Sequence, residues 1–218
     1  MRDEQLLRRQ IIAVALEMSR SGLSPGRSGN VSARFENGFL ITPSGLSYEQ
    51  LQEDEIVVVD GQGRAQHNSL EPSSEWRFHH DIYVNFPQAG GIVHCHSRHA
   101  TALACDHREI PAFHYMVAAA GGKKIPIAPY ALFGTQQLSD HVVAALAGYK
   151  ATLMAHHGLV AFGNDVNKAL DLAREVEELA AQYVCVLGLG GRQLLSDQQM
   201  DEVIERFKTY GKQGREQA

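Results

Sequence analysis

The chain has 218 residues, of which 44% are hydrophobic, and it carries 25 acidic against 20 basic side chains. This composition excludes a disordered protein and suits one domain with a substantial core. The net charge of −5 argues against nucleic-acid or membrane-surface binding, because no basic excess is available to neutralise phosphates. Three cysteines do not make a disulfide framework, and the charged start MRDEQLLRRQ is unlike a signal peptide. We therefore expect a soluble, cytoplasmic protein with a single domain over 1–218.

Strands and helices are predicted in an order whose sheet opens on a hairpin, where Glu36-Asn37-Gly38, with its Asn-Gly turn signal, separates two alternating runs. The expected elements of the first half are a helix over 3–21 with Asp3 as N-cap, strands over 30–35, 39–42 and 56–60, and a helix over 74–86 that opens at Ser73 or Ser74. Those of the second half are strands over 91–96, 125–129 and 151–157 and helices over 98–105, 136–147, 165–187 and 196–207. This order favours an α/β fold with a mainly antiparallel central sheet sandwiched by helices.

Eleven histidines are many for an acidic chain, and two of them form the pattern His94-Cys95-His96. Because side chains alternate along a strand, His94 and His96 point to one face and Cys95 to the other. Two imidazoles so placed can chelate one tetrahedral metal ion. The alternative is a pair of hydrogen-bonded histidines on a half-buried face.

A second pair, His156-His157, precedes Gly158 at the end of the apolar run 151–155. Neighbours on a strand face opposite ways, so at most one of these two histidines can join the first pair. A solvated turn histidine is an equally good interpretation of this motif alone. If one of them does join, three imidazoles plus an open position give the pattern of a catalytic zinc site.

Three polar segments could bind an anion. Ser73 and Ser74 precede a helix, where free backbone N–H groups attract negative charge, although plain N-capping is the more favoured use of these hydroxyls. Glu75 could complement the helix dipole or, beside a metal, act as a base. The glycine loops 27–30 and 42–45 are either ordinary turns or converging donors to a phosphate.

Seven short motifs follow one another along nearly the whole chain: GNVS from Gly29, TPSG from Thr42, SSEWRFH from Ser73, HCH from His94, HYM from His114, APY from Ala128 and HHG from His156. In this order they resemble the class II aldolase/adducin family, most closely its bacterial L-fuculose-1-phosphate aldolase branch. The resemblance implies an α/β fold and a homotetramer with active sites between subunits. It also implies one Zn²⁺ per subunit.

The resemblance assigns roles to particular residues. It implies zinc ligands at His94, His96 and His157, and a catalytic Glu75 that can also ligate zinc when no substrate is present. Tyr115 would protonate the aldehyde oxygen from a neighbouring subunit. Tyr210 would lie near the aldehyde, in a tail over about 208–218 that could cover the active site. The implied phosphate cradle consists of Asn30, Ser44, Gly45, Ser73 and Ser74.

The implied reaction is reversible cleavage of a ketose 1-phosphate, such as L-fuculose 1-phosphate, into dihydroxyacetone phosphate and a small aldehyde such as L-lactaldehyde. Alternatives are an aldolase for 5-deoxy-ribulose or methylthio-ribulose 1-phosphate and a sugar-phosphate epimerase or decarboxylase. A non-enzymatic adducin-like module is disfavoured, because all three histidines and Glu75 are present. Two departures from the family pattern bear on specificity: Arg27-Ser28, where Arg27 could add a phosphate contact, and the glycine-rich segment 188–195.

Overall fold

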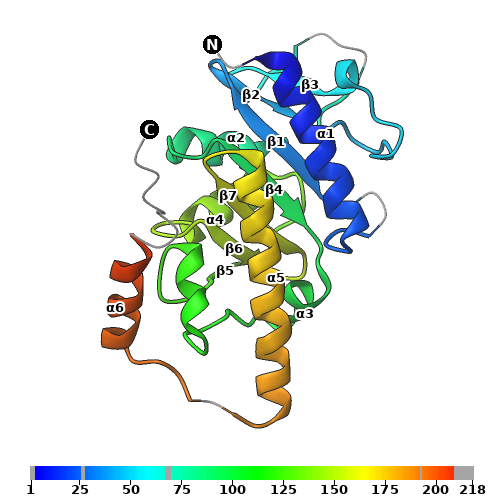
Figure 1. Ribbon diagram of the computed structural model, residues 1–218. Helices are drawn as coiled ribbons and strands as arrows, with labels where there is room; N and C mark the ends of the chain where they lie inside the picture. The colour runs from blue at the N-terminus through cyan, green and yellow to red at the C-terminus, as the bar shows by residue number, and fades with distance from the viewer. Residues whose placement is uncertain (1–2, 26–27, 67–69, 192, 209–218) are drawn as a thin grey trace, which may run out of the picture.

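The computed structural model describes residues 3–25, 28–66, 70–191 and 193–208. Within these residues a seven-stranded sheet runs through the molecule in the order β3-β2-β1-β4-β7-β6-β5 (Figure 1). All neighbouring strands are antiparallel except β5 and β6, which are parallel. The strands are β1 (Asn30–Phe35), β2 (Gly38–Ile41), β3 (Val57–Val59), β4 (Gly91–Cys95), β5 (Ile127–Ala128), β6 (Ala151–Met154) and β7 (Gly158–Gly163).

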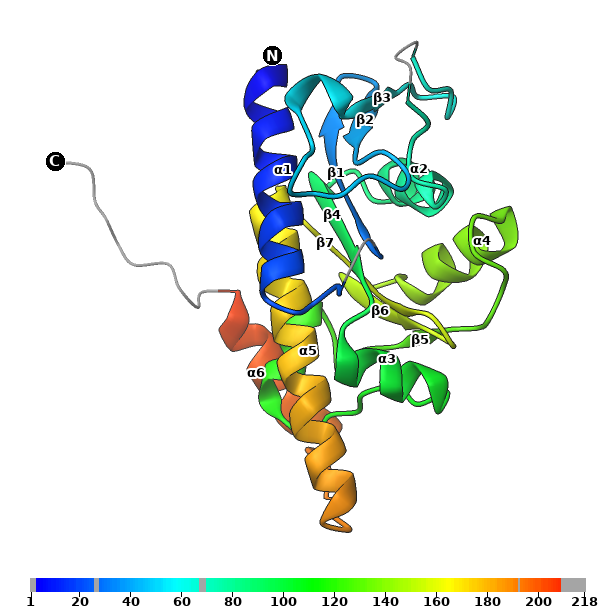
Figure 2. The same ribbon diagram turned by 90° about the vertical axis from the view of Figure 1, so that its right-hand side faces the viewer.

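Helices cover both faces of this sheet (Figure 2). Helices α1 (Glu4–Arg20) and α5 (Val166–Gly188) lie on one face, and α2 (Trp76–Asn85) and α4 (Gln136–Ala145) lie on the other. The remaining helices are α3 (Arg98–Cys105), α6 (Asp197–Phe207) and the short 3-10 turns η1 (Glu53–Glu55) and η2 (Tyr115–Ala120). The predicted α/β fold with a mainly antiparallel, helix-covered sheet is therefore confirmed.

The alternation of side chains along the strands divides the core between the two faces. In β4, Val93 and Cys95 pack into the core under α1 and α5, whereas Ile92 packs into the core under α2. His94 therefore shares the α2 face of the sheet with Ile92. The antiparallel register places Asn30 of β1 directly opposite His94, which brings the polar ends of two strands together on this face.

Most predicted elements are found within a few residues of their expected bounds. For the helices α1 and α6, the predicted N-cap residues form the expected hydrogen bonds. Asp3 accepts hydrogen bonds from the N–H groups of Gln5 and Leu6 at the start of α1. Ser196 and Gln199 form a reciprocal capping box at the start of α6. The short strand β5 lies at the edge of the sheet, as its flanking prolines predict.

One strand was not predicted. Strand β7 pairs with both β4 and β6 at the centre of the sheet, and its run Leu159–Phe162 is buried on both faces. Such a strand has no polar alternation, so the period-2 signal is missing. Because β6 ends at Met154 and β7 begins at Gly158, His157 lies in the turn of the β6–β7 hairpin and not at the end of a strand.

No helix within the described residues is both long and apolar enough to cross a membrane. The cytoplasmic location stays a prediction.

Helix α3, which directly follows the HCH motif, is capped from another helix. Its N-cap residue Ser97 makes no capping hydrogen bond with its side chain. Instead the carboxylate of Glu177 in α5 accepts the backbone N–H groups of His99 and Ala100, both at 3.0 Å, and the Nδ1 of His99 lies 2.8 Å from the same carboxylate. A charged acceptor on two otherwise free N–H groups anchors α3 to α5.

We expect Glu177→Gln to lower the free energy of unfolding by about 1–3 kcal/mol, because the amide replaces a charge-assisted acceptor. Burial alone would raise the pKa of Glu177, but hydrogen bonds donated at the start of α3 outweigh it and lower the pKa. A carboxyl with a lowered folded-state pKa stabilises the protein above its unfolded pKa of about 4.3. This contribution disappears as the pH falls through the folded-state pKa.

The check is urea unfolding of both proteins at matched concentration across a pH series. The difference between wild type and Glu177→Gln should be constant at neutral pH and shrink below about pH 4.3. A difference that grows on acidification would contradict the assignment.

Candidate metal centre and its pocket

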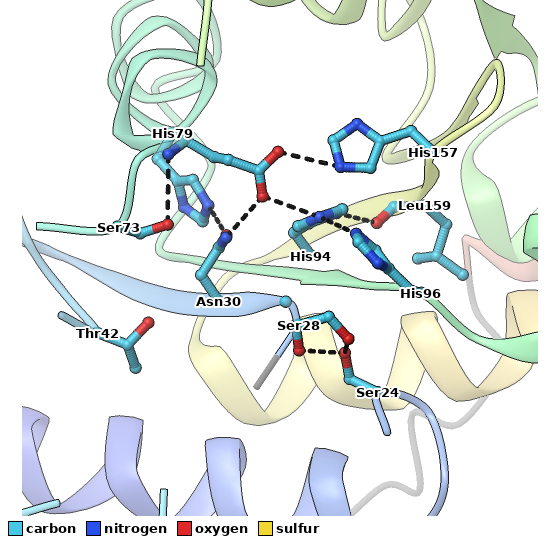
Figure 3. Close-up of polar contacts among 12 residues, drawn as sticks. Ser24, Ser28, Asn30, Thr42, Ser73, His79, His94, His96, His157 and Leu159 are labelled. Carbon is cyan, nitrogen blue, oxygen red and sulfur yellow. Dashed lines mark hydrogen bonds and ion pairs between the residues drawn. The ribbon is translucent and has the colours of Figure 1, made fainter. Parts of the chain in front are cut away.

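Three histidines from two segments, the end of β4 and the β6–β7 turn, meet at one point of the α2 face. The ligand nitrogens of His94, His96 and His157 all lie within 4.8 Å of one another. The Nε2 atoms of His94 and His96 are 3.0 Å apart, and Figure 3 shows His157 approaching them from the opposite side. Both histidines of the HCH motif and one of the two in the HHG motif therefore belong to a single cluster.

The turn between β6 and β7 positions the third histidine. His156 adopts a left-handed backbone conformation with φ of 55°, which reverses the chain and aims His157 at the pair on β4. Gly158 is required behind it, because a Cβ there would lie 2.5 Å from the carbonyl oxygen of Cys95 and 2.9 Å from the ring of His96. His156, the first histidine of the motif, is not in the cluster, and its Nε2 lies 2.7 Å from that of His107.

Hydrogen bonding aims His94 at the cluster. Its Nδ1 lies 2.8 Å from the carbonyl oxygen of Leu159 and donates to it, which leaves Nε2 to face the other imidazoles. A backbone acceptor on the far nitrogen is the usual support of a metal-bound histidine. Burial, with a smaller effect of charge on His94, lowers the pKa of His96 to about 3, so His96 is neutral and its ring can bind a cation.

Glu75 lies against the same cluster and is 7% exposed. Its Oε2 is 3.1 Å from Nε2 of His94, and its Oε1 is 3.1 Å from Nε2 of His157. Oε1 makes no hydrogen bond within the described part of the chain. Burial alone would raise the pKa of Glu75, but the charge of His94 and the close approach of His157 outweigh burial and hold it well below its usual range.

These observations fit a divalent cation. Burial would lower the pKa of His94, yet the Glu75 carboxylate outweighs burial and raises it, so the site stabilises positive charge where the three Nε2 atoms converge. Three imidazoles and a buried carboxylate oxygen lacking a hydrogen bond are donors suited to a metal of the zinc type. His94, His96 and His157 could hold such an ion and leave one position open.

The start of α2 differs from the sequence prediction. The helix was expected to open at Ser73 or Ser74 with Glu75 in its first turn, but it begins at Trp76 and Glu75 is the N-cap residue. The N–H of Ser73 donates to the carbonyl of Thr42 at 3.1 Å, and the carbonyl of Ser73 accepts the N–H of Trp76 at 3.0 Å. Ser73 is thus tied to the TPSG loop and opens a turn that precedes the helix. Its hydroxyl accepts the N–H of Glu75 at 3.3 Å.

The two glycine loops converge on one cavity of about 360 Å³ beside the cluster. Described residues from both loops and from the SSE segment line it together with two of the clustered histidines: Ser28, Gly29, Asn30, Pro43, Ser44, Gly45, Ser73, Ser74, Glu75, His96 and His157. The side chain of Asn30 also donates to Oε2 of Glu75 at 3.0 Å. The cavity thus joins hydroxyl and backbone N–H donors at one end to imidazoles and a carboxylate at the other.

Of the remaining predicted site residues, Tyr115 is the one that lies within the described part of the chain. Tyr115 begins η2, is 48% exposed and is absent from the described residues that line the cavity. Arg27 and Tyr210 lie outside the described residues.

Four further described residues that line the cavity had no predicted site role: Tyr130, Ala131, Phe133 and His156. Tyr130 and Phe133 expose 55% and 60% of their surface. The APY motif contains Tyr130 and could have indicated it, but nothing in the sequence distinguishes Phe133.

Comparison with known proteins agrees with this geometry. Residues 9–184 match the family model of the class II aldolase and adducin N-terminal domain. The L-fuculose phosphate aldolase of Escherichia coli strain K12 is 52% identical, over 96% of this chain and 97% of that protein. The 5-methylthioribulose-1-phosphate/5-deoxyribulose-1-phosphate aldolase of Rhodospirillum rubrum is 49% identical, over 94% of this chain and 92% of that protein.

Among solved structures, an L-fuculose 1-phosphate aldolase superposes with a TM-score of 0.90 at 33% identity, covering 93% of this chain and 96% of that one. Sequence, site and fold thus agree: the chain belongs to the class II aldolase and adducin family.

Proposed function

We propose that this chain is a metal-dependent aldolase that cleaves L-fuculose 1-phosphate into dihydroxyacetone phosphate and L-lactaldehyde. The observation that carries the proposal is the convergence of three imidazoles and Glu75 at one end of a cavity whose other end is lined by hydroxyls and glycine loops. The 52% identity to an L-fuculose phosphate aldolase supports this substrate over other ketose phosphates.

The residues that line the cavity have two proposed roles, which are binding of the phosphate and binding of the metal ion. Ser44, Gly45, Ser73, Ser74 and Asn30 would bind the phosphate, as hydroxyl, amide and backbone donors suit its oxygens. A Zn²⁺ ion held by the three histidines, when bound, supplies Lewis-acid stabilisation of negative charge on the substrate oxygens.

In the cleavage direction, the C4 hydroxyl loses its proton and the C3–C4 bond breaks, with its electron pair passing into the dihydroxyacetone phosphate half. Glu75, ionised and directed at the cluster, would carry the proton that is returned to C3, as a general acid and base.

We further propose that Tyr115 handles the proton on the aldehyde oxygen of a neighbouring subunit's site, within a homotetramer. Its position on an exposed turn, outside the residues that line its own chain's cavity, supports a role in a second copy. A cyclic assembly would repeat the same heterologous contact around the ring and complete every site.

Mixing two inactive variants tests this sharing. We expect Glu75→Gln and Tyr115→Phe homotetramers each to be weakly active, and co-refolded hybrids to regain activity, because some contacts then pair an intact Glu75 with an intact Tyr115. The measurement is aldol cleavage of the hybrids against each parent. Hybrids no more active than the parents would place both residues in the same chain's site.

The substrate assignment is tested by measuring dihydroxyacetone phosphate release from L-fuculose 1-phosphate, 5-deoxyribulose 1-phosphate and 5-methylthioribulose 1-phosphate. The second and third compounds represent the alternative function, which is favoured by the 49% identity to the Rhodospirillum rubrum enzyme. The proposal expects the highest kcat/KM with L-fuculose 1-phosphate. A higher kcat/KM with either ribulose compound would make that compound the assigned substrate. Formation of an epimer without release of dihydroxyacetone phosphate would exclude an aldolase.

A further inference from the structure

A chain of buried hydrogen bonds leads from the interior of the protein to Glu75. Tyr83 Oη lies 2.8 Å from Ser32 Oγ, which lies 2.7 Å from Nδ1 of His79. Nε2 of His79 lies 2.5 Å from Oδ1 of Asn30, whose Nδ2 is 3.0 Å from Oε2 of Glu75. All five side chains are buried, and those of Ser32 and His79 are fully so. Figure 3 shows His79 and Asn30 side by side at the centre of this chain.

The geometry of the Asn30 amide fixes the direction of these bonds. Its Nδ2 donates to Oε2 of Glu75, and its Oδ1 faces Nε2 of His79. The oxygen can only accept, so Nε2 of His79 carries the proton. Nδ1 then holds the lone pair, which accepts the hydroxyl hydrogen of Ser32.

His79 can take this role because it is neutral. Burial lowers its pKa to about 3, so the ring has one N–H and one lone pair at physiological pH. The opposite tautomer would turn its lone pair towards Asn30. The amide would then rotate its N–H₂ to His79 and set its oxygen against the carboxylate of Glu75, where two acceptors face each other without a proton.

We propose that His79 is a positioning residue: its Nε2–H locks the Asn30 amide in the orientation that holds the Glu75 carboxylate against His94 and His157. The effect on catalysis rests on the proposed aldolase function, whereas the hydrogen-bond chain does not. His79 is on α2, four residues after Glu75, so the helix that supplies the carboxylate also supplies the group that orients its partner.

The kinetic test compares two replacements of His79, one without a hydrogen-bond donor and one with a donor. His79→Phe removes the donor and frees the amide, and we expect it to lower kcat about 10- to 100-fold, with metal content close to wild type. His79→Gln retains an N–H₂ that can reach Asn30 and should recover most of the loss. His80→Gln is the matched control, because His80 bonds Asp81 and Gly61 instead, and its kcat should be unchanged.

An unchanged kcat in His79→Phe would overturn the proposal. Equal losses in the Phe and Gln variants, or a loss of metal that explains the rate, would also overturn it, because a merely structural role predicts those results.

A second measurement needs no substrate and no folded Phe variant. In metal-loaded protein labelled with ¹⁵N-histidine, we expect one imidazole that is absent from His79→Gln to be a neutral Nε2–H tautomer whose proton exchanges slowly with water. An Nδ1–H tautomer or a fast-exchanging proton at this ring would overturn the chain of bonds. Absence of aldolase activity in the wild type would overturn the proposed function and leave this result standing.

Discussion

Replacing Glu75 by Gln is expected to lower kcat for aldol cleavage by about 10²–10⁴-fold, the usual contribution of a general acid and base. The amide keeps the size and hydrogen-bonding shape of the side chain but cannot take up and return a proton at C3. Because the three histidines remain, the metal content should stay at that of the wild type. Steady-state kinetics and metal analysis of the same preparation measure both quantities.

The exposed Glu71, four residues earlier, provides a control for Glu75. Only its backbone carbonyl contacts the pocket loop, by accepting the N–H of Ser44, so Glu71→Gln should retain wild-type kcat. Near-normal turnover in Glu75→Gln would remove this carboxylate from the proton transfer. A parallel loss of metal would instead make Glu75 mainly a ligand.

Removal of one clustered imidazole is the second large effect. His96→Ala should weaken metal binding by more than the 10- to 100-fold expected for losing a supporting residue around a metal, since a ligand itself is lost. Cleavage activity should fall with occupancy and rise in part when excess Zn²⁺ is supplied. Competition with a chromogenic chelator measures the affinity.

His141→Ala is the matched control for that experiment. His141 lies on α4 and its Nδ1 bonds the carbonyl of Pro129, away from the cluster, so its loss should not change metal affinity. Wild-type affinity in His96→Ala would show that the metal is held elsewhere.

The sequence predicts most of the fold because local signals agree with the final structure. The helical spacing of 3–21, with Asp3 as its N-cap, is realised in α1, and the hairpin expected at Glu36-Asn37-Gly38 does join β1 to β2. Its turn consists of Glu36 and Asn37, because Gly38 already pairs with Phe35. The central strand β7 escaped prediction because a strand buried on both faces carries no alternation. The start of α2 was misplaced because Ser74 and Glu75 form a turn ahead of the helix, next to Ser73, which bonds Thr42 in a segment distant in sequence.

The sequence predicts the metal cluster, but it does not predict the hydrogen-bonded residues that orient Glu75 beside the cluster. Spacing alone puts His94 and His96 on one face, and motif order implies which of His156 and His157 joins them. The role of His79 depends on Ser32 and Asn30, which a separate strand brings within hydrogen-bonding distance. A residue that acts through partners so far away in the chain has no local signature. The roles of Arg27 and Tyr210 stay predictions.

The central claim is that the histidine cluster and Glu75 form a metal-dependent site for aldol cleavage. The most direct measurement is the rate of dihydroxyacetone phosphate release from L-fuculose 1-phosphate by the wild type, as purified, after chelation and after return of Zn²⁺. We expect dihydroxyacetone phosphate release that disappears on chelation and returns with the metal. An undiminished rate in metal-free protein, or no release by the fully loaded protein, would contradict it.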